Sequence, residues 1–173
     1  MIIVYTGNGK GKTTAALGLI LRSVGWGKRV LIVQFLKKRI SGEVKVLNEL
    51  RIMNYELRIK RFGTKELVDL KHLREIDYLE AKKGFDYSLS AIYNSLFDII
   101  VLDEINVALK FGLIKVNKVL ELIMIAKEKG VDLVLTGRWA HTELVEVADL
   151  VTEFKEIKHP FKKNGKAKKG IDY

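Results

Sequence analysis

A glycine-rich segment near the start of the chain has the residue types that bind phosphate. It meets the pattern G-x-x-x-x-G-K-[ST] except at its first position, and a helix-forming run follows it. In such a loop the backbone N–H groups surround phosphate oxygens, and the helix N-terminus adds partial positive charge. We expect Lys12 to contact the phosphates and the Thr13 hydroxyl to hold Mg²⁺. The candidate nucleotide-binding residues of this loop are Thr6, Gly7, Asn8, Gly9, Lys10, Gly11, Lys12, Thr13 and Thr14.

Two carboxylates follow a second apolar run. Asp103 and Glu104 come directly after Ile99–Leu102, the arrangement in which a strand presents an acid to a nucleotide-bound metal. Such an acidic pair alone often caps a helix. Together with the glycine-rich loop, it predicts a nucleoside triphosphate site with Mg²⁺ or Mn²⁺, in which one acid holds the metal directly or through water. The candidate metal ligands are Thr13, Asp103 and Glu104.

The remaining chemistry-bearing residues indicate no nucleophile of the chain's own. Cysteine is absent, and His72, His141 and His159 are scattered without metal-ligand or triad spacing. Arg138 comes just after an apolar run, at the sheet edge where ligands bind, although a surface arginine in a tight turn has the same pattern. The attacking group is therefore predicted to come from a substrate or from water.

Length and composition limit the classes of protein to which this chain could belong. The chain has 173 residues, 48% of them hydrophobic, and a formal net charge of +10. We interpret residues 1–173 as a single nucleotide-binding domain with a basic tail from about residue 155. No apolar run is long enough for a membrane span, and no signal-peptide pattern occurs, so we expect a cytoplasmic protein. Nucleic-acid binding is disfavoured because the lysine-rich tail offers only Phe161 and Tyr173 for stacking on bases.

The pattern of apolar residues predicts an α/β fold. Short β-branched runs alternate with helical patterns, which is typical of a doubly wound, mostly parallel sheet covered on both faces. The predicted strands are Ile2–Tyr5, Arg29–Phe35, Ile99–Leu102 and Val131–Leu135, with weaker candidates at Tyr55–Ile59 and Leu150–Phe154. The predicted helices are Thr13–Val24, Glu66 to about Lys82, Val116–Lys129 and about Thr142 to Val147.

Several motifs, taken together and in order, resemble one known family. The chain is similar to ATP:corrinoid adenosyltransferases, of the phosphate-loop type that acts on cob(I)alamin, over nearly its whole length. The resemblance implies the RecA-like architecture of phosphate-loop NTPases. The matching segments are Thr6–Gly18, Gly25–Lys37, Gly42-Glu43, Val101–Leu113, Leu135–Arg138, Ala148–Phe161 and the terminal KGIDY, Lys169–Tyr173.

The resemblance implies a reaction and its participants. The 5′-deoxyadenosyl group of ATP would pass to the cobalt of a reduced corrinoid, cob(I)alamin or a precursor, and triphosphate would leave. Lys12, Thr13 and Glu104 would be the catalytic residues, and Glu43 and Arg138 would complete the nucleotide pocket. The family also implies a homodimer and an electron-donating flavoprotein reductase as partners.

Two aromatic residues are candidates for contact with the corrinoid. Phe62 matches the Phe of a family loop that displaces the lower ligand of the corrinoid, but Lys65 stands where the family has Trp. Trp139, just after Arg138, is the second candidate, although ordinary packing is also open for it. A phosphate-loop ATPase or a small-molecule kinase with another acceptor is the alternative function.

Overall fold

The computed structural model describes the whole chain except residues 37–40, 53–55, 65, 67, 159–167 and 172–173. Six strands form one sheet in the order β3-β2-β4-β5-β1-β6, and every neighbouring pair is parallel. All carboxyl ends therefore meet at one edge of the sheet. The strands are β1 Ile2–Thr6, β2 Val30–Gln34, β3 Leu57–Arg61, β4 Ile99–Asp103, β5 Asp132–Thr136 and β6 Leu150–Glu153.

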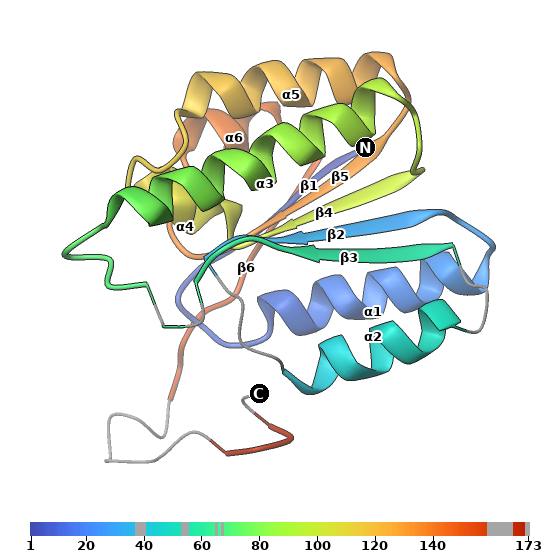
Figure 1. Cartoon of the computed structure of the whole chain (residues 1–173), viewed down its shortest axis with the longest axis horizontal. Helices are drawn as coiled ribbons and strands as arrows, with labels where there is room; N and C mark the ends of the chain where they lie inside the picture. The colour runs from blue at the N-terminus through green and yellow to red at the C-terminus, as the bar shows by residue number, and fades with distance from the viewer. Residues whose placement is uncertain (37–40, 53–55, 65, 67, 159–167, 172–173) are drawn as a thin grey trace.

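Helices cover both faces of the sheet. In Figure 1, α1 and α2 lie on one face and α3, α4, α5 and α6 on the other. The doubly wound α/β prediction is confirmed, with a sheet that is wholly parallel. The helices are α1 Lys12–Gly25, α2 Gly42–Ile52, α3 Glu75–Tyr93, α4 Ile105–Lys110, α5 Val116–Glu128 and α6 Thr142–Val147.

Alternation along the central strands divides the core into two apolar layers. In β2, Leu31 and Val33 pack toward the α3–α6 face, whereas Val30 and Ile32 pack toward α1 and α2. Every residue of β2 and β4 is buried, which explains why these strands are apolar nearly throughout. This two-sided burial fixes the carboxyl ends of β1, β2, β4 and β5, where the candidate site residues lie.

The helix predicted over Glu66 to about Lys82 is wrong in its bounds. The helix begins at Glu75 and continues to Tyr93, and its apolar residues Ile76 and Leu79 are 40% and 48% exposed. Residues 68–74 are not helical: a turn lies at residues 70–71 and a bend at residue 72, and Arg74 caps the helix. The carboxylate of Asp77 accepts hydrogen bonds from the Arg74 backbone N–H at 2.9 Å and from its guanidinium at 3.2 Å. Leucine spacing alone did not reveal this cap.

The weaker strand predictions are confirmed, and two helices were missed. β3 and β6 occupy most of the two weaker candidates; Tyr55 lies outside the described residues. α2 and α4 were not predicted; α4 has only 6 residues and is almost wholly buried, so no helical amphipathic pattern marks it. In the part of the chain that the structure describes, no helix is long and apolar enough to span a membrane.

The cap of α3 predicts a measurable pH dependence of stability. Hydrogen bonding from the Arg74 guanidinium lowers the pKa of the Asp77 carboxyl below its ordinary value of 3.8. Asp77→Ala should lower the free energy of unfolding by about 1–2 kcal/mol near neutral pH. Because the pKa is depressed in the folded state, this contribution is present above 3.8 and is lost as pH falls through the folded pKa.

Urea unfolding of both chains across acidic pH measures this loss, and Asp86→Asn, an exposed carboxylate on the same helix, is the control. A stability difference that stayed constant down to the lowest pH would contradict the assigned cap.

Candidate active site

The glycine-rich loop is shaped by its packing against the end of β6. Gly7 has a φ of +95°, and a Cβ there would lie 2.4 Å from the carbonyl oxygen of Phe154. The backbone N–H of Gly9 donates to that same oxygen at 2.7 Å. A side chain at Gly7 would therefore both strain the backbone and push β6 away, which explains the glycine at the first turn after β1.

Lys12 lies within this loop at the start of α1. Its ammonium donates to the carbonyl oxygens of Gly7 at 2.6 Å and Gly9 at 2.7 Å. Burial lowers the pKa of Lys12; the nearby Glu104 carboxylate opposes that shift, and Arg138 adds to it. A partly desolvated cation is thus held within the loop. Its contact with phosphate stays a prediction.

Asp103 is the buried anchor of the site at the end of β4. Its side chain is 1% exposed, and its Oδ1 accepts hydrogen bonds from the hydroxyls of Thr13 at 3.0 Å and Thr136 at 2.7 Å. Its Oδ2 accepts from the amide of Gln34 at 3.1 Å. Side chains from α1, β2 and β5 therefore converge on one carboxylate, and the Thr13 hydroxyl is oriented by it.

Glu104 holds an uncommon backbone conformation between β4 and α4. Its φ is +65°, in the left-handed region that non-glycine residues rarely adopt and that often occurs at functional sites. Its backbone N–H donates to the Thr136 hydroxyl at 3.1 Å, and its side chain lines the same cavity as Lys12 and Thr13. This conformation ends the buried strand and places the second carboxylate at the cavity while Asp103 stays behind Thr13.

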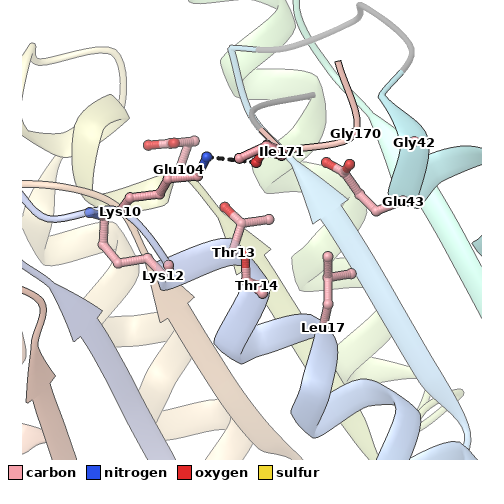
Figure 2. Close-up of a pocket in the computed structure, with 11 residues that line it drawn as sticks. Lys10, Lys12, Thr13, Thr14, Leu17, Gly42, Glu43, Glu104, Gly170 and Ile171 are labelled. Atoms are coloured by element: carbon pink, nitrogen blue, oxygen red, sulfur yellow. Dashed lines mark hydrogen bonds between the residues drawn. The ribbon is translucent and has the colours of Figure 1, made fainter. Parts of the chain in front are cut away.

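A cavity of about 500 Å³ lies in front of the loop, a size typical of small-molecule sites. Figure 2 shows side chains from the loop, α1, α2 and the end of the chain around it. Glu43, in the first turn of α2, lines this cavity, and its predicted contact with a nucleotide stays a prediction. The lining residues are Lys10, Gly11, Lys12, Thr13, Thr14, Leu17, Gly42, Glu43, Glu104, Gly170 and Ile171.

Other predicted residues lie beside this cavity rather than in its wall. Asn8 and Arg138 line a neighbouring cavity of about 440 Å³, together with Lys155. The Thr6 hydroxyl accepts a hydrogen bond from the Ala140 backbone N–H at 3.0 Å, which fastens the loop after β5 to the start of the phosphate loop. Several of the predicted site residues are therefore divided between these two cavities.

Comparison with known proteins identifies the family. A family model described as ATP:corrinoid adenosyltransferase BtuR/CobO/CobP matches residues 1–173. The chain belongs to this family. The corrinoid adenosyltransferase of a Sinorhizobium species is 36% identical over 185 residues, covering 100% of this chain and 80% of that protein. The corrinoid adenosyltransferase of Salmonella typhimurium is 34% identical over 173 residues, covering 100% and 85%.

A solved structure supports the architecture of this adenosyltransferase family member. A KaiC-like protein from Pyrococcus horikoshii aligns with a TM-score of 0.54 at 20% identity, over 88% of this chain and 71% of that chain. At this identity the likeness concerns the fold alone. Together with the parallel sheet, it confirms the expected RecA-like architecture.

The two aromatic candidates of this adenosyltransferase family member lie outside the wall of the 500 Å³ cavity. Phe62 is partly buried, with its ring 5.9 Å from that of Tyr87 and against Gly84 of α3. Trp139 has a φ of +59°, is 40% exposed and lies under the Arg138 guanidinium, 4.9 Å from the ring centre. A corrinoid-binding role for both stays a prediction, and Lys65 lies outside the described residues.

Six residues of the site were not among those predicted from the sequence: Gln34 and Thr136 beside Asp103, and Leu17, Gly42, Gly170 and Ile171 in the wall of the cavity. Gln34 and Thr136 end β2 and β5, so their position at the carboxyl edge of the sheet was the signal that could have found them. Gly170 and Ile171 belong to the family-matching KGIDY segment, but only the tertiary structure shows that the end of the chain lies against the loop.

Proposed function

We propose that this chain transfers the 5′-deoxyadenosyl group of ATP to the cobalt of a reduced corrinoid, cob(I)alamin or a precursor. The cobalt electron pair forms a bond to C5′, the C5′–O5′ bond breaks, and its electron pair leaves with triphosphate. The observation that carries the proposal is the cationic phosphate loop with Lys12 at the cavity, in a chain of this family. Such a site stabilises a polyanionic leaving group without supplying a nucleophile.

The phosphate loop and two residues outside it would bind the nucleotide. The backbone from Gly7 to Thr14 binds the triphosphate, and Lys12 neutralises the charge that develops on it. Lys10 lines the same cavity and adds a second positive charge. Glu43 contacts the nucleotide from α2, and Arg138 contacts it from the adjacent space.

The oxygen donors beside the loop fit Mg²⁺ or Mn²⁺. A threonine hydroxyl and two carboxylates are hard ligands of the kind that Mg²⁺ prefers. Thr13 and Glu104 would hold the ion, with Asp103 orienting the Thr13 hydroxyl from 3.0 Å. Among the described residues no group of three or more His, Cys, Asp or Glu side chains could hold a metal, so phosphate oxygens and water would complete the shell. The ion would draw charge from the triphosphate as it leaves.

The corrinoid and the partner proteins are part of the same proposal. Phe62 and Trp139 contact the corrinoid, a flavoprotein reductase supplies its electrons, and two chains form a homodimer in a single-domain, cytoplasmic protein. Family membership supports the corrinoid as a substrate, and Trp139 is a candidate because it lies beside Arg138. Sedimentation that gives a monomer would remove the homodimer from the proposal.

The reaction products test the proposal against its alternatives. In an anaerobic assay with chemically reduced cob(I)alamin, ATP and Mg²⁺, we expect an adenosylated corrinoid spectrum and triphosphate in equal amounts. ADP and orthophosphate with an unchanged corrinoid would instead indicate an ATPase, and ADP with a phosphorylated acceptor would indicate a kinase.

A further inference from the structure

Residues 168–171, at the end of the chain, lie against the phosphate loop. The ammonium of Lys10 donates a hydrogen bond to the carbonyl oxygen of Ile171 at 2.6 Å, across 161 positions of sequence. Gly170 and Ile171 also line the 500 Å³ cavity. Figure 2 shows this contact as a dashed line, with Glu43 of α2 and Leu17 of α1 around the same space. We name residues 168–171 the terminal strap.

The strap has a defined turn. The backbone N–H of Ile171 donates to the carbonyl of Lys168 at 3.1 Å, and Gly170 has a φ of +79°. This positive φ favours glycine, so the turn that sets the direction of the Ile171 carbonyl depends on the residue type at position 170. The strap is therefore a hydrogen-bonded turn whose conformation depends on Gly170.

The side chains of the strap are better suited to contact with a nucleotide than to packing within the protein core. The Ile171 side chain is 61% exposed although it borders a cavity, and Leu17 is the other large aliphatic residue among the described lining residues. A ligand with an apolar part would bury both side chains. Lys168 and Lys169 are exposed and add positive charge beside a site for a polyanion.

We infer that the terminal strap forms one wall of the ATP site. Ile171 packs on the nucleoside part of ATP opposite Leu17, and the Ile171 carbonyl keeps the Lys10 ammonium at the phosphates. The inference rests on the proposed function and deepens it, because it assigns Lys169–Ile171 of the KGIDY segment to nucleotide retention. Its failure is separable from failure of the reaction, since nucleotide binding is measurable without a corrinoid.

Binding of a fluorescent, non-hydrolysable ATP analogue with Mg²⁺ tests the strap. A chain that ends at residue 167 should bind the analogue about tenfold more weakly than the full chain. Gly170→Ala, which keeps the length and strains the turn, should weaken binding about threefold. The matched control is Gly130→Ala, since Gly130 has a φ of +69° with equally open surroundings but follows α5, outside the lining of the cavity.

Kinetic measurements on the same chains separate an effect on ATP binding from an effect on the rate of adenosyl transfer. In the cob(I)alamin assay the shortened chain should show a raised KM for ATP with kcat within about twofold of the full chain. Equal affinity in the full and shortened chains would overturn the strap, and tighter binding after shortening would overturn it too, because the segment would then obstruct the site. If the full chain itself failed to bind the analogue, the proposed function would fall instead.

Discussion

Lys12→Ala is expected to reduce kcat/KM for adenosyl transfer at least about a thousandfold. The Lys12 ammonium lies inside the loop, 2.6 Å from the Gly7 carbonyl oxygen, where it is positioned to meet the phosphates directly. The triphosphate that leaves carries several negative charges, and the loss of a partly desolvated cation raises the barrier more than it weakens ground-state binding. The measurement is the initial rate of corrinoid adenosylation at saturating cob(I)alamin.

The fold should survive this substitution. Lys12 is partly exposed in the first turn of α1, and alanine has a high helix propensity. Lys28→Ala is the control, since Lys28 is exposed just before β2, at the opposite edge of the sheet. Near-normal turnover in the Lys12→Ala chain, with an unchanged unfolding midpoint, would refute the assigned role.

Asp103→Asn is expected to raise the Mg²⁺ concentration for half-maximal activity by about 10- to 100-fold. Asp103 is buried and orients the Thr13 hydroxyl from 3.0 Å, so removal of its charge weakens the field at the metal site without opening the core. Gln34 can turn its amide to accept a hydrogen bond from the side-chain amide that the substitution introduces. The free energy of unfolding should therefore change by only about 1 kcal/mol.

Activity across a Mg²⁺ titration, beside urea unfolding, measures both effects. Asp132→Asn is the control, because Asp132 is about half exposed at the start of β5, away from the carboxyl edge, where it pairs with the chain's amino terminus. An Asp103→Asn chain with the parent Mg²⁺ dependence would show that this carboxylate does not serve the metal.

The fold was predictable where local pattern and tertiary packing agree. β2 and β4 are buried on both faces, so their apolar runs marked them directly. The predicted bounds of α3 were wrong because the leucine spacing before Glu75 has a helical period. Arg74 and Asp77 cap the helix further along the chain. α4 was not predicted because a helix of 6 residues, almost all buried, has no polar face and so no amphipathic pattern.

The site was predictable where one short segment carries the chemistry. Lys12, Thr13 and the two carboxylates were found from spacing, and the structure brings them to one cavity or directly behind it. Gln34 was missed because its role arises from its pairing beside Asp103 across two strands. The contact between Lys10 and Ile171 spans nearly the whole chain, and no local pattern encodes it.

In the proposed reaction the bond from C5′ to its oxygen breaks, and no phosphorus is attacked. ATP with a heavy oxygen isotope at the 5′ bridging position tests it directly, with reduced cob(I)alamin and Mg²⁺ under anaerobic conditions. We expect the isotope in free triphosphate and none of it in the adenosylated corrinoid. Isotope retained in ADP, with orthophosphate or a phosphorylated acceptor released, would contradict it.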